Sequence, residues 1–200
     1  MFYINIILIP FRNRKEHLDI FLKKLIFLFY SYLKPFKIVI IEQLNDKSFN
    51  RAKLLNIGYS LFKESGQYFF HHDIDIIPTE DTIKNIYTVE NYDVLRIYNA
   101  HQSSLGGIVK FTKDSYEKIN GLPNYIWGWG IEDRSFYYRC KTMELNISEN
   151  LSNNNNFTFL KHMSNACVFE EIKKILVTKK IIFILMKLRK IKLIIFFQVG

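Results

Sequence analysis

Two aspartates separated by a single residue follow an apolar run in the segment FFHHDIDIIP, residues 69 to 78. Asp73 and Asp75 come soon after His71 and His72. Because carboxylates this close repel each other, we expect a positive charge beside them. Paired carboxylate oxygens suit a hard divalent cation such as Mg²⁺ or Mn²⁺, which could also bridge to phosphates. A bound metal ion is therefore one interpretation. The other is that these aspartates form turns or cap a helix, as most aspartates after a strand do.

Two arginines follow the first apolar run of the chain, in the segment IPFRNR. Arg12 and Arg14 would lie just after the carboxyl end of a strand, and guanidinium groups match the geometry of phosphate oxygens. On these residues alone, two surface arginines in a solvated loop are an equally good interpretation. Considered with the aspartate pair, they favour a ligand that contains phosphate.

A third cluster combines aromatic and acidic residues in the segment YIWGWGIEDR. Trp127 and Trp129 are separated by a glycine, and Glu132 and Asp133 follow. Sugars stack on aromatic faces, and a neighbouring carboxylate suits general-base work on a hydroxyl. The structural alternative is that the tryptophans close one end of the domain while the acids cap a helix. The cluster therefore favours a saccharide ligand and leaves this alternative open.

The segments that must position these residues alternate between strands and helices. Apolar runs predict strands over residues 3–9, 37–42 and 67–72, with helices over residues 16–33 and 50–64 between them. This alternation is typical of an α/β domain with a mostly parallel sheet. Ligands of open α/β sheets bind beyond the carboxyl ends of the strands. We therefore expect the arginines and the aspartate pair at that edge of the sheet.

The second half of the chain has a less regular pattern. We expect a strand over residues 94–98 that leads to the segment SSLGGIVKF, where Gly106 and Gly107 allow the backbone to approach a ligand or a partner closely. The segment TKDSYEKINGLP predicts a short helix that is capped by Thr112 and ends near Gly121. A polar connection, NISENLSNNNNF, follows the third cluster.

The positive charge of the chain is concentrated at its C-terminal end. The formal net charge is +9, and residues 161–200 hold nine Lys and Arg against two Glu, a surplus of seven. The sequence therefore predicts a nearly neutral domain over residues 1–165 and a basic, apolar helical tail over residues 166–200. The tail could lie on an anionic membrane surface or pack on the domain. Its basic residues alternate with aliphatic ones, so nucleic acid is not an expected partner.

The cysteines and the first residues bear on the compartment. Cys140 and Cys167 lack the spacing of a structural zinc site or a disulfide framework, so a reducing compartment is expected. The first apolar run has no basic region before it and no small-residue cleavage site after it, so we expect no signal peptide. These features predict a cytoplasmic protein, with peripheral contact to the membrane if the tail binds lipid.

Four blocks of sequence, in this order and spacing, resemble the β-1,4-galactosyltransferase family (glycosyltransferase family seven). They are IPFRNRKEHL, FNRAKLLNIGY, FFHHDIDIIP and GGIVKFTKDSYEKINGLPNYIWGWGIED, with a weaker echo at FLKH. The resemblance implies a GT-A glycosyltransferase fold, an α/β fold in which a Rossmann-like nucleotide-binding sheet is flanked by helices beside an irregular acceptor-side half. It also implies inverting, Mn²⁺-dependent transfer of galactose or N-acetylgalactosamine from a UDP donor to a hydroxyl of a glycan or glycolipid acceptor.

The resemblance further implies a role for individual residues of these blocks. Asp133 would be the catalytic base, and Glu132 beside it would hold sugar hydroxyls. Asp75 and His162 would ligate the metal. The nucleotide sugar would be bound by Pro10, Arg12, Arg14, Phe49, Arg51, Asp73, Ile74, Gly107 and Trp129.

Four positions depart from the family pattern. Ile131 replaces a glycine, and Arg134 replaces an aspartate that helps to hold an acceptor sugar, which leaves the acceptor open. Ser104 stands where a larger residue tunes the choice between galactose and N-acetylgalactosamine, which leaves the donor sugar open. Phe159 stands where vertebrate members offer a methionine to the metal. The alternative to an active enzyme is therefore a non-catalytic remnant of the same fold that binds a nucleotide sugar or a glycan.

Overall fold

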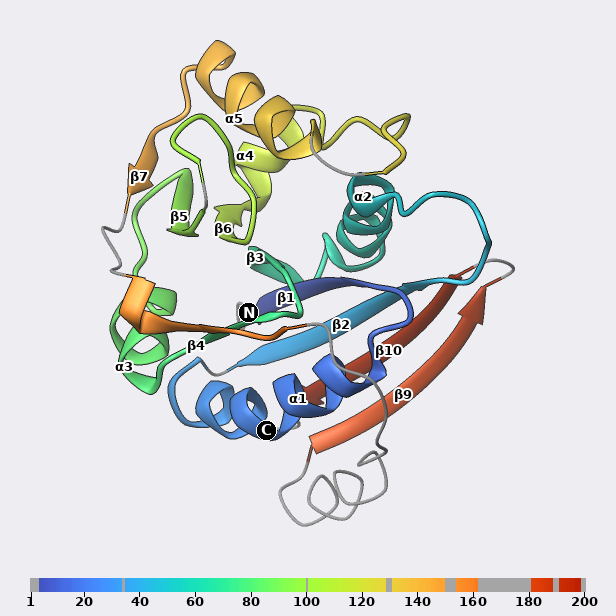
Figure 1. Cartoon of the computed structure of the whole chain (residues 1–200). Helices are drawn as coiled ribbons and strands as arrows, with labels where there is room; N and C mark the ends of the chain where they lie inside the picture. The colour runs from blue at the N-terminus through green and yellow to red at the C-terminus, as the bar shows by residue number, and fades with distance from the viewer. Residues whose placement is uncertain are drawn as a thin grey trace.

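The computed structural model describes residues 4–33, 35–99, 101–128, 131–149, 154–161, 181–188 and 191–198. Eight strands form one sheet (Figure 1): β1 (Ile4–Phe11), β2 (Phe36–Gln43), β3 (Gly66–His72), β5 (Val94–Tyr98), β6 (Ile108–Thr112), β7 (Ile147–Glu149), β9 (Ile181–Leu188) and β10 (Ile191–Gln198). Their order across the sheet is β7-β5-β6-β3-β1-β2-β10-β9. The longer helices are α1 (Lys15–Tyr32), α2 (Arg51–Phe62) and α5 (Glu132–Thr142).

The first half of the chain forms the parallel part of the sheet, as its alternating pattern predicts. β1 lies at the centre and pairs in parallel with β2 on one side and with β3 on the other. Successive side chains of a strand point to opposite faces. Accordingly, Ile7 and Ile9 pack with the residues of α1, whereas Ile6 and Leu8 pack with those of α2. The two crossover helices therefore cover opposite faces of the sheet.

The second half adds antiparallel strands and a short helix. β6 pairs antiparallel with β3 and with β5, and β5 pairs in parallel with β7. The predicted strand at residues 94–98 is confirmed as β5, and the predicted short helix is confirmed as α4 (Lys113–Lys118). The Thr112 side chain caps α4 by accepting a hydrogen bond from the Ser115 backbone N–H. Beside the main sheet, β4 (Ile76–Pro78) pairs with β8 (Phe157–Phe159).

The C-terminal tail is not the helix that we predicted, where the structure describes it. β9 and β10 form an antiparallel hairpin, and β10 pairs antiparallel with the free edge of β2. Lys192 Nζ lies 3.2 Å from Glu42 Oε2 across this pairing. The prediction was wrong because the isoleucine-rich sequence suits a strand, and the edge of β2 offers unpaired backbone groups. The domain boundary at residues 165 and 166 lies outside the described residues, and tail contact with an anionic membrane stays a prediction.

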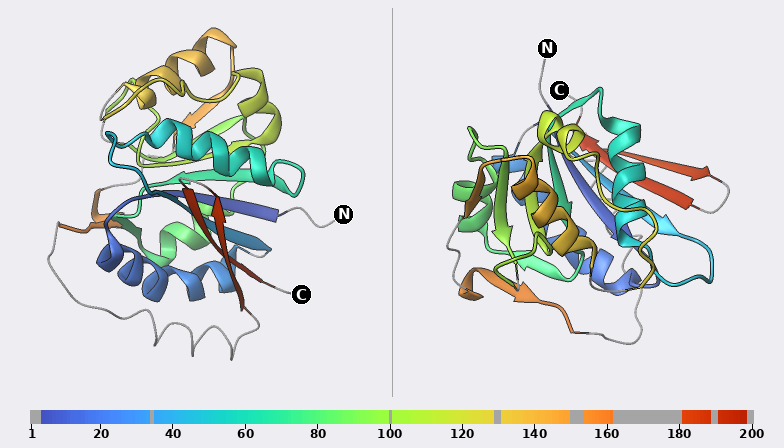
Figure 2. Two further views of the ribbon diagram at one scale, coloured as in Figure 1. Left: turned by 90° about the vertical axis from the view of Figure 1, so that its right-hand side faces the viewer. Right: turned by 90° about the horizontal axis from the view of Figure 1, so that it is seen from above.

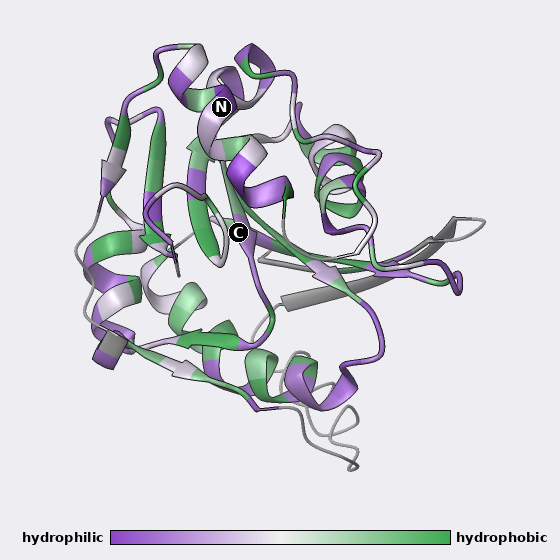
Figure 3. Ribbon diagram, turned by 45° about the horizontal axis from the view of Figure 1, so that its top comes forward, coloured by the Kyte–Doolittle hydropathy of each residue, from purple (hydrophilic) through white to green (hydrophobic). Residues whose placement is uncertain are grey.

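Two apolar layers form the core, one on each face of the sheet. α1 and the short segment α3 (Glu80–Thr82) with the π-helix η1 (Ile83–Tyr87) cover one face, while α2, α4 and α5 cover the other (Figure 2). The strands between them are the most hydrophobic segments of the fold (Figure 3). Within the described ranges, none of the helices combines the length and the apolar character that crossing a lipid bilayer would require.

Candidate functional site

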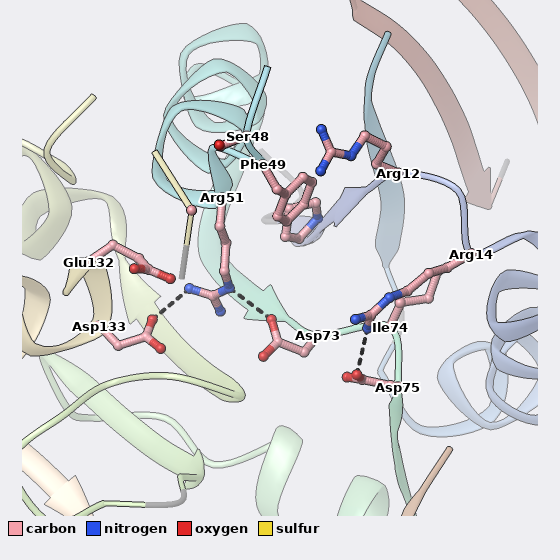
Figure 4. A pocket seen from close by; sticks show the side chains of 12 residues that line it. Arg12, Arg14, Ser48, Phe49, Arg51, Asp73, Ile74, Asp75, Glu132 and Asp133 are labelled. Carbon is pink, nitrogen blue, oxygen red and sulfur yellow. Dashed lines mark hydrogen bonds and ion pairs between the residues drawn. The ribbon is translucent and has the colours of Figure 1, made fainter. Parts of the chain in front are cut away.

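A cleft of about 500 Å³ opens at the carboxyl ends of β1 and β3, between the N-termini of α2 and α5 (Figure 4). This is the edge of the sheet where α/β folds bind ligands. We call it the main cleft. It is lined by Pro10, Arg12, Arg14, Ser48, Phe49, Arg51, Asp73, Ile74, Asp75, Gly128, Glu132 and Asp133. The topology thus brings together residues from four separate segments of the chain.

The turn that leads into α2 is held in place by buried hydrogen bonds. The side chain of Gln43, the last residue of β2, accepts from the Asn50 backbone N–H (2.9 Å) and donates to the Lys47 carbonyl (3.1 Å). Arg12 also donates to the Lys47 carbonyl, and its guanidinium lies 5.4 Å from the centre of the Phe49 ring. One wall of the main cleft is therefore fixed before any ligand binds.

Arginines supply the positive charge that we expected beside the aspartate pair. Arg51 Nε lies 2.9 Å from Asp73 Oδ1, and Arg51 Nη1 lies 2.7 Å from Asp133 Oδ1 (Figure 4). Arg14 Nη1 lies 2.6 Å from Asp75 Oδ2. The Arg51 side chain is only 9% exposed, so it forms a buried bridge between the loop after β3 and the start of α5. The repulsion between the two aspartates is thus offset within the protein itself.

The two histidines of the FFHHDIDIIP segment do not supply that charge. His71 is fully buried among Phe111, Tyr116 and Phe136. Burial, reinforced by the charge of Arg51, lowers the pKa of His71 well below its ordinary value. His72 is also fully buried, and burial lowers its pKa to about 4. Both rings are therefore neutral near pH 7, and they belong to the core.

The tautomer of the neutral His72 ring is set by its hydrogen bonds. Its Nδ1 lies 2.9 Å from the Asp73 carbonyl oxygen, and its Nε2 lies 2.8 Å from the Tyr87 hydroxyl. Because a carbonyl oxygen can only accept, Nδ1 carries the proton and Nε2 accepts from Tyr87. The hydrogen bond from His72 Nδ1–H therefore holds the backbone carbonyl of Asp73 in place.

Burial shifts two aspartates of the main cleft, Asp133 and Asp73, toward the protonated form. It raises the pKa of the Asp133 carboxyl above its ordinary value, while Arg51 opposes this shift and Glu132 adds to it. Burial likewise raises the pKa of Asp73 against the opposing effect of Arg51. Burial alone would lower the pKa of the Arg51 guanidinium, but Asp133, Asp73 and Glu132 raise it above its ordinary value. Arg51 therefore stays charged, and Asp133 accepts a proton more readily than an exposed aspartate does.

A glycine lets the loop before β6 pass directly beside the Asp133 carboxylate. The Leu105 backbone N–H donates to the Asp133 carbonyl (3.0 Å), and a Cβ at Gly106 would lie 2.4 Å from Asp133 Oδ2. Gly107 adopts a φ of +65°, and its carbonyl accepts from the Asp73 backbone N–H (3.0 Å). The close approach that we expected at this glycine pair therefore serves to place Asp133 and Asp73.

The charges that line the main cleft fit a divalent cation together with a phosphate ligand. Four carboxylates (Asp73, Asp75, Glu132 and Asp133) face three guanidinium groups (Arg12, Arg14 and Arg51). A diphosphate would add further negative charge, which a hard cation held by aspartate oxygens would offset. The described residues contain no group of three or more His, Cys, Asp or Glu side chains that could hold an ion alone. A metal ion held by Asp75 would therefore need other ligands to complete its coordination. The role of Asp75 stays a prediction.

All but three of the predicted site residues line the main cleft. Gly107 is not among the lining residues, and Trp129 and His162 lie outside the described residues. Ser48 and Gly128 also line the main cleft, although we did not predict them. The sequence could have indicated both residues, because Ser48 directly precedes Phe49 and Gly128 separates the two tryptophans of a predicted block. The individual roles of the lining residues stay predictions.

All four departures from the family pattern lie in the described part of the chain: Ile131 directly precedes α5, and Arg134 lies in its first turn. Ser104 is buried and donates its hydroxyl hydrogen to Asn99 Oδ1 (2.8 Å), and it does not line the main cleft. Phe159 is half exposed, and its ring centre lies 5.0 Å from that of Tyr98.

Comparison with known proteins gives matches along most of the chain. A family model described as the N-terminal region of glycosyl transferase group 7 matches residues 3–90, and one described as the N-terminal domain of galactosyltransferase matches residues 88–163. Human beta-1,4-galactosyltransferase 4 is 32% identical over 166 residues, which cover 78% of this chain and 48% of that protein. Pig beta-1,4-galactosyltransferase 5 is 34% identical over 155 residues, which cover 71% and 39%. The chain thus spans about half the length, or less, of these relatives.

Similar folds occur among solved structures. The catalytic domain of Drosophila beta-1,4-galactosyltransferase 7, in complex with xylobiose, has a TM-score of 0.74 at 21% identity, covering 100% of this chain and 96% of that one. A mutant of the same Drosophila protein, in complex with manganese, UDP-Gal and xylobiose, has the same TM-score at 20% identity and the same coverage. These similarities confirm the predicted GT-A fold.

The matched regions contain all four blocks that carried the sequence resemblance. The two models together extend from residue 3 to residue 163, and curated relatives exceed 30% identity over more than two thirds of the chain. The chain belongs to the β-1,4-galactosyltransferase family, glycosyl transferase group 7.

Proposed function

We propose that this chain is an inverting glycosyltransferase that moves galactose or N-acetylgalactosamine from a UDP donor to a hydroxyl of a glycan or glycolipid acceptor. The observation that carries the proposal is that Asp133 shares one cleft with Asp73, Asp75 and three arginines. The curated relatives are named as beta-1,4-galactosyltransferases, which supports the reaction and a galactose donor. The Drosophila structure with manganese, UDP-Gal and xylobiose supports the donor, the metal and the class of acceptor.

The arginines of the main cleft are suited to bind the diphosphate of the donor. Arg12 and Arg14 lie on the turn after β1, where their forks can meet phosphate oxygens. Arg51 Nη2 is buried and has no hydrogen-bond partner within the described part of the chain. An unsatisfied buried donor is costly, so a ligand oxygen that accepts from Nη2 would be bound favourably. We assign that oxygen to the donor nucleotide sugar.

Asp133 is the group that would activate the acceptor. Its Oδ1 is engaged by Arg51, which leaves Oδ2 to take the proton of the acceptor hydroxyl. The oxygen of that hydroxyl attacks the anomeric carbon from the face opposite UDP, so the configuration at this carbon inverts. The bond from the anomeric carbon to the UDP oxygen breaks, and its electron pair leaves with the diphosphate. Arg12 and Arg14 stabilise the charge that develops there.

A divalent metal fits the same site. When bound, Mn²⁺ would supply further positive charge to the leaving diphosphate. Asp75 would hold it, since this carboxylate keeps one oxygen free of its ion pair with Arg14. The free carboxylate oxygen of Asp73 lies in the same loop and faces the same space. Removal of divalent metal by EDTA should therefore abolish transfer, and Mn²⁺ should restore it.

The decisive experiment measures UDP release from a panel of UDP-sugars in the presence of Mn²⁺ and saccharide acceptors. Asp133→Asn should lower kcat by about 10²–10⁴-fold, the usual contribution of a general base, and leave UDP affinity nearly unchanged. Asp114→Asn is the matched control, because Asp114 is exposed on α4 and does not line the main cleft. Full activity of Asp133→Asn would defeat the proposed role of this carboxylate.

The same assay separates the enzyme from a binding remnant of the same fold. The departures at Ile131 and Arg134 are the observations that favour a remnant. A remnant would bind UDP with the affinity of wild type in both Asp133→Asn and the control, and no sugar would be transferred by any of the three proteins. Binding of UDP without turnover across the whole panel would therefore replace the proposed reaction by nucleotide-sugar binding.

A further inference from the structure

A second pocket lies next to the main cleft and has an unusual charge balance. It has a volume of about 560 Å³ and is lined by His101, Gln102, Ser103, Arg134 and Tyr138. Three of these residues come from the loop between β5 and β6, and two come from one face of α5, four residues apart. No carboxylate belongs to its described lining, so a guanidinium and an imidazole are its ionisable cationic groups.

The second pocket is close to the proposed catalytic base. Arg134 directly follows Asp133 in the first turn of α5. On the other wall, the loop that contributes Ser103 reaches Gly106, whose backbone passes beside Asp133 Oδ2. Three residues span at most about 11 Å, so Ser103 lies within that distance of Gly106. A saccharide with one hydroxyl at Asp133 could therefore extend toward the second pocket.

The loop wall of this pocket is fixed by hydrogen bonds from the side chains of Arg96, which is buried, and Asn99. Arg96 Nη2 donates to the Gln102 carbonyl (2.8 Å), while Arg96 Nη1 pairs with Glu149 at 2.9 Å. Asn99 Nδ2 donates to the Ser104 carbonyl (2.7 Å). A wall that is ordered before binding reduces the entropic cost of binding a ligand.

Nothing in the described fold accounts for the positive charge of Arg134. The residue is exposed, and it forms no ion pair with a carboxylate in the described part of the chain. It also lies in the first turn of α5, where the helix dipole disfavours a cation. The position therefore costs stability and gains no partner within the described fold, which points to a ligand.

We infer that the second pocket binds an anionic substituent of the acceptor saccharide, a carboxylate or a phosphate, through the guanidinium of Arg134. The inference rests on the proposed glycosyltransferase function and specifies its acceptor. A guanidinium can hold two oxygens of either group at once. His101 adds a second donor, and the exposed ring of Tyr138 offers a face to the sugar. The acceptor class is thus an acidic saccharide.

The test compares acceptors that differ in the acidic group. The pairs are p-nitrophenyl β-glucuronide against p-nitrophenyl β-glucoside, and N-acetylglucosamine 6-phosphate against N-acetylglucosamine. We expect kcat/KM for UDP release to be at least about tenfold higher for the acidic member of at least one pair. The pair with the larger ratio identifies carboxylate or phosphate as the preferred group. Ratios near one in both pairs would overturn the inference.

Variants of α5 test the role of Arg134 directly. Arg134→Gln should bring the ratio of acidic to neutral acceptor close to one, and Arg134→Lys should retain part of it. Lys141→Gln is the matched control, since it removes a cation from the same helix outside the pocket, and both the ratio and the rates should stay at wild-type values. An unchanged ratio in Arg134→Gln would contradict the inference.

A binding measurement keeps this inference separate from the proposed reaction. If no acceptor is used, the proposed reaction fails, and the pocket is then judged by saturation-transfer NMR with two pairs of ligands. These are methyl β-glucuronide against methyl β-glucoside, and N-acetylglucosamine 6-phosphate against N-acetylglucosamine. Selective binding of the acidic member of either pair that is lost in Arg134→Gln would support the second pocket even then. Absence of selective binding in folded wild-type protein would overturn it.

Discussion

The main cleft and the second pocket each contain an arginine close to Asp133, one paired with it and one next to it in the chain, and the two are in different electrostatic situations. In the main cleft, Arg51 is buried and pairs with both Asp73 and Asp133. In the second pocket, Arg134 is exposed and no carboxylate lines the pocket with it. The first arginine holds the protein together, whereas the second is available to a ligand. Of these two positive charges, that of Arg51 thus contributes to stability, whereas that of Arg134 is available to determine specificity.

The largest effect expected from this contrast is on stability. Arg51→Met would leave Asp73 and Asp133 without their shared counter-charge, and we expect the free energy of unfolding to fall by roughly 3 kcal/mol. That is the lower end for a broken buried pair, because the two carboxylates are 30% and 27% exposed. Arg134→Met should change it by less than about 0.5 kcal/mol. Urea unfolding of both variants checks this, and equal losses would break the comparison.

The next effect concerns the position of Asp133. Gly106→Ala would place a methyl carbon 2.4 Å from Asp133 Oδ2, which is too close, so the carboxylate must move away. We expect kcat to fall by about 10²-fold, as for a misplacement of about 1 Å, while UDP affinity stays the same. UDP affinity is the internal control, since Gly106 does not line the main cleft. A variant with wild-type kcat would show that the exact place of this carboxylate is unimportant.

The pH dependence of the transfer rate should report the raised pKa of Asp133 in the main cleft. Burial raises the pKa of Asp133, and the base must be ionised to accept a proton. The rate should therefore rise with pH through a pKa above the ordinary aspartate value and reach its plateau above it. A profile of kcat/KM with a neutral acceptor measures this limb. A profile that stays flat down to about pH 4 would contradict the raised pKa.

The smallest effect is expected at the rim of the main cleft. The Arg14–Asp75 pair is about one third exposed on both sides, so its contribution to stability is at most about 1 kcal/mol. Arg14→Ala should therefore unfold almost as wild type does, while UDP affinity falls by roughly tenfold as one phosphate contact is lost. Isothermal titration with UDP measures the second quantity. Unchanged affinity would place the diphosphate elsewhere in the cleft.

The sequence predicted the parallel half of the fold well because its signals are local. Apolar residues predominate in the segments before residues 10, 43 and 73, and the helices between them have the length of a crossover. The place of Arg12, Arg14, Asp73 and Asp75 then follows from the rule that ligands meet the carboxyl ends of strands. The resemblance of the four blocks to a known family also assigned the start of α5 to this site. Hydrophobic periodicity alone would not have predicted that.

What the sequence did not predict depends on contacts between distant residues. Arg51 and Asp133 are 82 positions apart, and no local pattern indicates that they pair. The core position of His71 and His72 was missed for a similar reason, since their partners Tyr87 and Phe136 lie in other elements. The tail was predicted as a helix because its basic and apolar residues mix without a strict period. The isoleucine-rich sequence also suits a strand, and pairing with the open edge of β2 selects that structure.

The pairing of β10 with β2 has a consequence for how the chain folds. The strands β1, β2 and β3 can assemble from consecutive crossover units. The outer edge of β2 instead pairs with β10, which lies far along the chain. Contacts between distant segments form slowly, because the long intervening loop must first be closed. During that interval the unpaired backbone N–H and C=O groups at the edge of β2 are open to pairing with other chains. Refolding should accordingly have a late step, and the early intermediate is the species most prone to associate.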